Sequence, residues 1–111
     1  MIVSEALRQR FLRDPLQIRL GNIASALARA ASWSDSPEHH EVVGSVLKEA
    51  TCFCEWAVPD APPEMQAVLA ELQAMLAGWE SQRQGGVLDS EMCSHARRKS
   101  DELLKLAGLV E

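Results

Sequence analysis

The sequence of 111 residues contains no long apolar run. No window approaches the about 18 apolar residues that a membrane-spanning helix needs, and Met1–Arg8 lacks the uninterrupted apolar stretch of a signal peptide. Cysteine is scarce too: there are three, an odd number, and Cys52 and Cys54 lie too close together on a predicted helix to pair comfortably. These absences predict a cytoplasmic protein in a reducing compartment, without a membrane partner.

Sequence motifs for most kinds of catalysis are missing as well. The six glycines never form a phosphate-binding loop after a strand, and short connections between helices offer few platforms for a Ser-His-Asp triad. A di-iron bundle needs Glu-x-x-His pairs, whereas Glu91 and His95 are four residues apart. The basic triplet Arg97-Arg98-Lys99 does not form a stripe, because successive helical side chains point about 100° apart. We therefore expect no enzymatic activity, no cofactor and no nucleic-acid partner.

What is present is typical of one small acidic domain. Hydrophobic residues make up 47% of the chain and charged residues 24%, close to the globular average. Sixteen acidic and eleven basic side chains give a formal net charge of −5. The charges are unevenly spread, since residues 35–80 carry nine acidic side chains and one basic one. We predict a single domain over residues 1–111, with an N-terminal arm (1–13) and a helical bundle (14–110).

Helix-start signals divide the chain into segments with helical periodicity. These signals are Asp14-Pro15, Ser36-Pro37, Asp60 ahead of Pro62-Pro63, and Asp89-Ser90. Between them apolar residues recur at steps of three and four, which predicts helices over about 14–33, 37–57, 62–83 and 89–108. Ser4–Leu12 can add a short leading helix. Because the connections are short, we expect an all-α fold, an up-down-up-down antiparallel four-helix bundle.

The apolar stripes also predict which residues belong to the core. Trp79 lies in line with its stripe, Cys54 lies beside Phe53 on another, and Cys52 falls on the far side of that helix. In the last predicted helix Lys99 interrupts the stripe. This interruption predicts that the last helix covers the core of the bundle incompletely, which leaves apolar surface for a second subunit to cover.

Four short segments of the sequence form a recognisable combination. They are Arg19–Ser25, Glu55-Trp56-Ala57, Glu71-Leu72-Gln73 with Gly78-Trp79, and Leu106–Leu109. In combination they resemble a group of small uncharacterised cyanobacterial helical proteins. The likeness covers most of residues 16–110, and this chain departs from it by a shorter connection at Gly85-Gly86. The resemblance implies a small helical protein of a photosynthetic bacterium and supplies no activity.

Every histidine of the chain falls near one end of the predicted bundle, together with a cysteine. These residues are His39, His40, Cys93 and His95. Neutral imidazole and thiolate are the ligands that zinc prefers, so a metal or another small ligand is the alternative to protein contact. Cys93 and His95 are two residues apart and so point about 200° apart around a regular helix. A layer of partly exposed histidines without a metal is the simpler interpretation.

Several features favour contact with a protein partner, including a second copy of this chain as a homodimer. Trp33 and Trp56 lie at the edges of their stripes, where tryptophan either covers a core or anchors an interface. The basic arm, with Arg8, Arg10, Phe11 and Arg13, complements the acidic middle of the chain, on its own body or on a neighbour's. Two stripes of small residues indicate either tight internal packing or a further contact face: Gly21, Ser25, Ala28 and Ser32, and Ala67, Ala70, Ala74 and Ala77.

Overall fold

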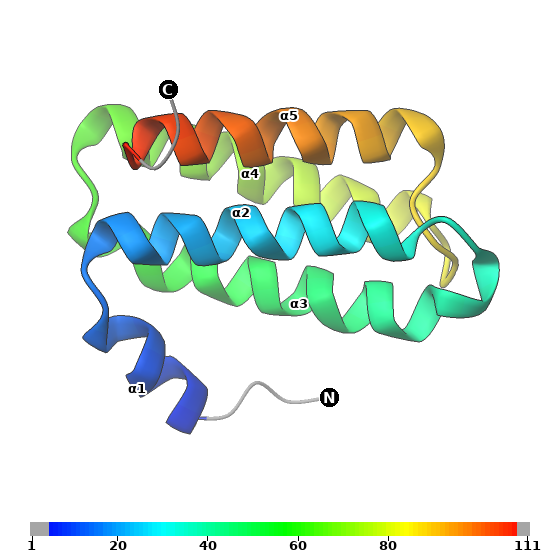
Figure 1. Ribbon diagram of the computed structural model, residues 1–111, viewed down its shortest axis with the longest axis horizontal. Coiled ribbons are helices and arrows are strands. Elements are labelled where there is room, and N and C mark those ends of the chain that lie inside the picture. Colours follow the sequence, from blue (N-terminus) through cyan, green and yellow to red (C-terminus); the bar gives the residue numbers. More distant parts are fainter. Residues whose placement is uncertain (1–4, 109–111) are drawn as a thin grey trace.

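The computed structural model describes residues 5–108, and these fold almost entirely into helices (Figure 1). The elements are α1 (Glu5–Arg13), α2 (Leu16–Trp33), the 3₁₀ turn η1 (Pro37–His39), α3 (His40–Ala57), the 3₁₀ turn η2 (Val58–Asp60), α4 (Pro63–Gln82) and α5 (Ser90–Leu106). No strand occurs in this range, so the all-α class is confirmed. Each long helix begins and ends within three residues of its predicted bounds. Ser4 and the residues after 108 lie outside the described part of the chain.

The helix starts differ in how their first amides are satisfied. At α5 the prediction is confirmed, because the Asp89 side chain accepts a hydrogen bond of 2.8 Å from the Met92 amide. At α2 and α4 the residue that precedes the helix is a proline, Pro15 and Pro62, and no side-chain cap forms. The Asp60 side chain is therefore free for another contact, and Arg19 donates to it and to the backbone carbonyl of Asp14, as described below.

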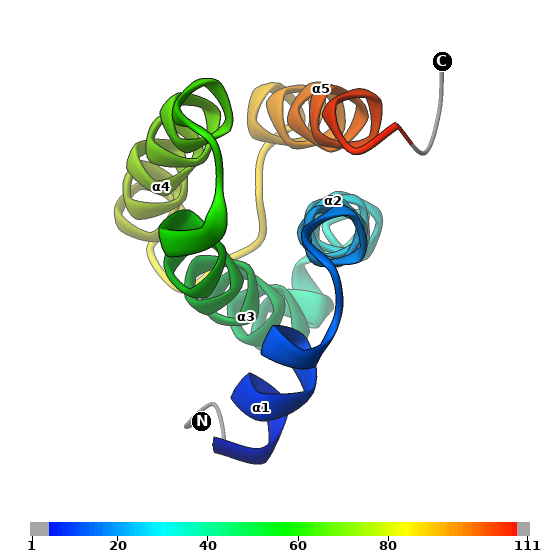
Figure 2. The ribbon, with the colours of Figure 1, turned by 90° about the vertical axis from the view of Figure 1, so that its left-hand side faces the viewer.

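The four long helices lie side by side around one core, with α1 on the outside of α3 (Figures 1 and 2). Viewed along the helices in Figure 2, α2 lies between α3 and α5, and α4 lies on the far side of the core. The largest fully buried side chains come from all four of these helices: Leu20, Ile23, Leu27, Val43, Leu47, Cys54, Leu69, Leu72, Leu76 and Leu103. One continuous apolar core therefore joins the helices.

Helix α2 is packed most closely, against α3 on one side and α5 on the other. Its inward positions include Ala24, Ala26, Ala30 and Ala31, all buried. Because alanine extends only one carbon from the backbone, it lets neighbouring helices approach closely. A buried hydroxyl adds one polar contact here, since Ser100 on α5 donates a 2.8 Å hydrogen bond to the Ala24 carbonyl.

Helix α4 is attached differently. Only Leu69, Leu72, Leu76 and Trp79 of its twenty residues are buried, and these large side chains hold its backbone farther from the neighbouring helices. Its approach to α5 is the loosest between any two long helices that follow one another in the chain. Trp79 and Cys54 are buried as predicted, and Cys52 is half-buried as predicted.

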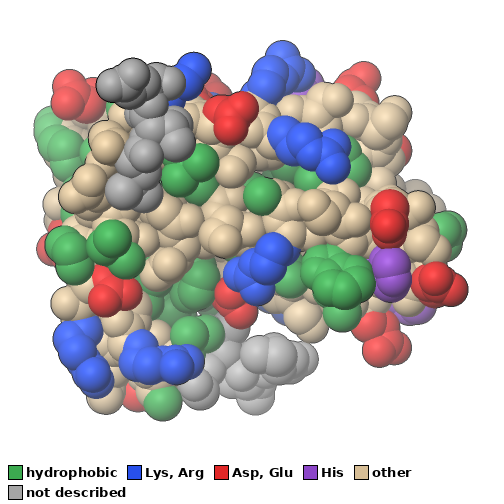
Figure 3. All heavy atoms as spheres, viewed as in Figure 1, with side chains coloured by type: hydrophobic (Ala, Val, Ile, Leu, Met, Phe, Trp, Pro, Cys, Tyr) green, Lys and Arg blue, Asp and Glu red, His purple; other side chains and the backbone are tan. Residues whose placement is uncertain are grey.

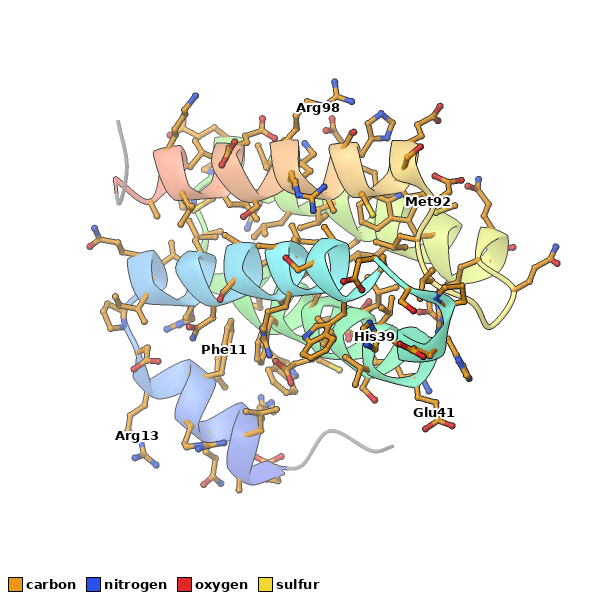
Figure 4. All side chains as sticks on the ribbon, turned by 45° about the vertical axis from the view of Figure 1, so that its right-hand side comes forward. Phe11, Arg13, His39, Glu41, Met92 and Arg98 are labelled. Atoms are coloured by element: carbon orange, nitrogen blue, oxygen red, sulfur yellow. The ribbon has the colours of Figure 1, made fainter. Side chains whose placement is uncertain are left out.

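Helix α1 packs against α3 of its own chain through aromatic rings. Phe11 is 2% exposed and stacks on Phe53, with ring centroids 4.5 Å apart and planes inclined by 7°. Trp56 lies against both rings at 5.8 and 5.9 Å. Figure 4 shows Phe11 directed toward the body of the protein and Arg13 directed away from it. The arm therefore docks on its own body.

The connection between α4 and α5 depends on a glycine and an arginine. Gly85 has a φ of +81°, a left-handed conformation that glycine adopts without strain. The Arg83 guanidinium donates to the Gly86 carbonyl and folds over α3 at Gly44. A Cβ at position 44 would lie 2.6 Å from the Arg83 Nη2 atom, so a larger residue there would require the flexible end of the Arg83 side chain to shift.

No helix within residues 5–108 combines the length and the apolar character needed to cross a bilayer.

Candidate functional site

The outward side of α2 carries an apolar surface with little charge. We define the α2 outer face by residues that share this side of the helix: Ile18, Gly21, Ser25, Ala28, Arg29, Ser32 and Trp33. Ile18 and Trp33, at its two ends, are 41% and 44% exposed, although both are large and apolar. The two are fifteen residues apart, which is about 22 Å along a helix.

Between Ile18 and Trp33 the side chains are small and face solvent. Ser25, Ala28 and Ser32 are exposed and Gly21 is half-buried. The interpretation of this stripe as internal packing is therefore wrong. The stripe Ala67, Ala70, Ala74 and Ala77 on α4 is exposed too and does not pack internally either. Both α2 and α4 pack against neighbouring helices through other side chains, which are larger or more deeply buried.

The α2 outer face is nearly uncharged. Its one charged residue is Arg29, whose guanidinium lies 3.1 Å from the Glu49 carboxylate on α3. In Figure 3, which has α2 at the front, the middle of the molecule shows few charged side chains, and more of them lie above and below. A face with small side chains, little charge and large apolar residues at its ends has the composition of a contact surface.

Contacts from the following turn hold Trp33 in place. The His39 ring meets the Trp33 ring edge to face, with centroids 4.8 Å apart. His39 Nδ1 lies 2.9 Å from the Trp33 carbonyl and 2.9 Å from the Asp35 carboxylate. Both are acceptors, so Nδ1 carries the proton and donates. These contacts fix the position of the exposed indole before any partner binds. A side chain fixed in advance loses less conformational entropy on binding.

The predicted metal ligands are not brought together. His39 is engaged with Trp33, and His40 Nδ1 donates to the Pro37 carbonyl at 3.2 Å. Cys93 is buried with its sulfur 3.7 Å from the Ala31 carbonyl, and His95 lies in a groove between α4 and α5. Over residues 5–108, no group of three or more His, Cys, Asp or Glu side chains is placed to hold a metal ion. The geometry thus gives the metal hypothesis no support.

The three thiols differ in surroundings. Burial raises the pKa of the Cys54 thiol to about 12. Burial also raises the pKa of Cys52, with further contributions from the negative charges of Glu55 and Glu49. All three cysteines are free. Neither Cys52 nor Cys54 has the lowered pKa that an attacking thiolate requires.

The predicted interaction residues of the arm divide into two groups. Phe11 is buried and Trp56 half-buried, so the α1–α3 contact uses both within the chain. Arg8, Arg10 and Arg13 are exposed. Arg8 contacts Glu5 of its own helix at 3.2 Å, which leaves the charges of Arg10 and Arg13 directed to solvent.

Arg19, which the sequence groups only with the basic residues that complement the acidic middle of the chain, is a structural residue. Its side chain is 11% exposed and donates to the Asp14 carbonyl at 2.8 Å and the Leu12 carbonyl at 3.3 Å. It also lies 2.7 Å from the Asp60 carboxylate in η2. Arg19 therefore ties the end of α1 and the α3–α4 connection to α2. Arg19 lies four residues before Ile23 of the apolar stripe, and this helical spacing is the sequence signal that could have revealed it.

Comparisons with protein-family models, with curated proteins and with solved structures each return no match. The function is therefore argued from the geometry of this chain. The resemblance to small cyanobacterial helical proteins stays a prediction.

Proposed function

We propose that this protein acts by protein contact, first of all with a second copy of itself, and does not catalyse a reaction. The observation that carries the proposal is the α2 outer face. Two large apolar side chains, Ile18 and Trp33, are held exposed at the ends of a nearly uncharged row of small residues. Tryptophan is among the residues that contribute most to binding energy at protein interfaces.

The spacing along α2 favours an antiparallel pairing of two α2 helices about a twofold axis. Ser25 lies close to midway between Ile18 and Trp33. In such a pair Ser25 faces its own copy, and Trp33 of each chain meets Ile18 of the other. The small residues between them allow the two helices to approach closely. One apolar anchor at each end then sets the register.

The scaffold that we propose for this face is the up-down-up-down bundle of α2, α3, α4 and α5. Short connections and the side-by-side course of the four helices in Figures 1 and 2 support it. In this arrangement α2 has α3 and α5 on its inward sides, which leaves its remaining side outward. The setting that we propose is the cytoplasm, where three free cysteines are stable.

The exposed arginines of the arm offer a second contact. Arg10 and Arg13 project from α1, and residues 35–80 carry a net charge of −8. Attraction between the arm of one chain and α3–α4 of another would weaken as salt screens the charges. Association through the α2 outer face depends on apolar contact and would not weaken. Salt dependence therefore separates the two modes.

The test is the mass of the protein over a range of concentrations, by native mass spectrometry and sedimentation equilibrium. We expect the wild-type mass to rise from 12.2 kDa toward twice that value. Ser25→Arg places a charge at the centre of the face and is expected to keep the chain monomeric. Ser94→Arg is the matched control, because it makes the same substitution at an exposed serine on α5, outside both stripes of small residues.

Two outcomes contradict the proposal. One is a wild type that stays monomeric even at millimolar concentration, and the other is an equal loss of association in Ser25→Arg and Ser94→Arg. The same mass spectra report any stoichiometric ion, which would return attention to His39, His40, Cys93 and His95.

A further inference from the structure

An open groove runs between α4 and α5, on a different part of the surface from the α2 outer face. Its volume is about 710 Å³, within the range of about 300–1,000 Å³ that is usual for small-molecule sites. Glu71 and Met75 form the α4 wall, and α5 provides the other side from His95 to Leu106. The groove exists because α4 approaches α5 only loosely.

A buried lysine, Lys99, lines the groove. Lys99 is 8% exposed, and its ammonium donates to the Glu71 carboxylate of α4 and to the Glu102 carboxylate of α5, the latter at 2.7 Å. Burial acts to lower the pKa of Lys99, but the hydrogen bonds and charges of Glu102 and Glu71 outweigh it and raise that pKa. Lys99 is therefore a cation at neutral pH and not a free amine nucleophile. The geometry indicates binding rather than covalent chemistry.

The two carboxylates do not hold Lys99 equally firmly. The Glu102 side chain is 46% exposed and comes from the same helix as Lys99, whereas the Glu71 side chain is 64% exposed and comes from the opposite wall. An ion pair with so exposed a partner contributes little, because water screens the carboxylate and solvates it when it leaves. Glu71 is therefore the group that an incoming anion can replace.

More positive charge surrounds this lysine. Arg98 and Lys105 line the groove, and within residues 5–108 neither forms an ion pair. Figure 4 shows Arg98 projecting outward from α5. Asp101 is the one further carboxylate in the lining. With Glu71 displaced, the cations of the groove outnumber its carboxylates on a protein whose net charge is −5.

The groove also has an apolar part. Met75 is half-buried in the α4 wall, and Leu106 is 40% exposed at the end of α5. Methionine adapts its shape to an apolar ligand, since its side chain is flexible and polarisable. A short alkyl chain that lies on these two residues removes their apolar surface from water.

We propose that the α4–α5 groove binds a small amphiphilic anion. The anionic head group replaces Glu71 at the Lys99 ammonium, close to Arg98 and Lys105, and the alkyl chain lies on Met75 and Leu106. Glu102 stays with Lys99. The site is independent of the proposed self-contact, because no residue of the α2 outer face takes part.

The test is titration of the full chain with octanoate, by calorimetry and by NMR of the methionine methyl groups. Glu71→Gln removes the carboxylate that competes with the ligand, and we expect it to tighten octanoate binding about tenfold. Glu64→Gln is the matched control, since it removes the same charge from α4 at an exposed residue outside the groove. Lys99→Met is expected to abolish binding.

Two further probes define the ligand chemistry. Acetate, which lacks the alkyl chain, is expected to bind at least tenfold more weakly than octanoate, and octylammonium, with the opposite charge, is expected not to bind. The proposal is overturned if octanoate does not bind at millimolar concentration, or if octylammonium binds as well. It is equally overturned if Glu71→Gln tightens binding no more than Glu64→Gln, and this comparison decides the question even if Lys99→Met fails to fold.

Discussion

The two sides of the core are built from different residues. On the α2 side, alanines bring three helices close together, and polar groups make hydrogen bonds within the core, as Ser100 does with the Ala24 carbonyl. On the α4 side, four large side chains form the whole buried contact, and a groove with charged walls separates α4 from α5. Small residues therefore give this protein a rigid half, and large ones leave the other half more open.

The same contrast holds for the two buried cations. Arg19, on the α2 side, donates to two backbone carbonyls as well as to the exposed Asp60 carboxylate, and the two carbonyls, which belong to the chain itself, make its role structural. Lys99, on the α4 side, donates only to carboxylates that water can solvate. A cation with exchangeable partners can serve a ligand, whereas one with fixed partners cannot. This difference is why we place the ligand site at Lys99.

The largest expected effect comes from truncating one core leucine on each side. Leu27 on α2 and Leu72 on α4 are both fully buried. Leu27→Ala leaves a cavity that the close-packed helices cannot fill, so we expect a loss of about 4 kcal/mol in the free energy of unfolding. Leu72→Ala is expected to cost about 2–3 kcal/mol, because α4 can shift inward. Urea denaturation followed by circular dichroism measures both, and an equal or larger loss at Leu72 contradicts the comparison.

Substitution of the two buried cations, Arg19 and Lys99, is expected to change the free energy of unfolding by smaller and unequal amounts. Arg19→Gln leaves the Leu12 and Asp14 carbonyls without their donor, and we expect it to lower the free energy of unfolding by about 2 kcal/mol. Hydrogen exchange in α1 is expected to rise with it. Lys99→Met replaces a buried cation with an apolar side chain of similar length, so we expect a change within about 1 kcal/mol. If Lys99→Met destabilises the protein more than Arg19→Gln, the division into structural and exchangeable cations is wrong.

The helices could be predicted from the sequence because their causes are local. Apolar spacing and the start signals gave each long helix to within three residues, and Trp79 and Cys54 were placed correctly in the core. The side of α2 that faces the core follows from its apolar spacing too, since Leu20, Ile23 and Leu27 are fully buried. The role of its small residues could not be predicted, because alanine occurs on both sides of the helix, buried as Ala24 and exposed as Ala28.

The partners of Lys99 and Arg19 depend on tertiary structure. The sequence showed that Lys99 interrupts an apolar stripe, but Glu71 is 28 residues away and meets it only because α4 is held at a particular distance from α5. Asp60 is likewise 41 residues from Arg19, and it is free to reach Arg19 because no side-chain cap forms at the start of α4. Residue spacing along one helix carries no information about either distance.

Alkaline pH gives the third effect, a gradual one that is the smallest of the three up to about pH 10, and it acts on both sides of the core. Cys54 and Lys99 both hold their protons more tightly in the folded chain, because their pKa values are raised above 9.0 and 10.5 respectively. The stability that each contributes is therefore complete below its ordinary pKa and is lost as pH rises. For Cys54 the loss begins near pH 9 and continues to about pH 12, at up to about 1.4 kcal/mol per pH unit.

The two contributions can be separated by urea midpoints measured between pH 8 and 11. Cys54→Ala is less stable at every pH because of its cavity, but its midpoint is expected to fall less steeply between pH 9 and 10.5 than that of the wild type. Lys99→Met is expected to follow the wild type up to about pH 10.5 and to fall less steeply above it. A Cys54→Ala midpoint that falls as steeply as the wild-type midpoint below pH 10.5 would show that the buried thiol ionises without cost, which the complete burial of Cys54 argues against.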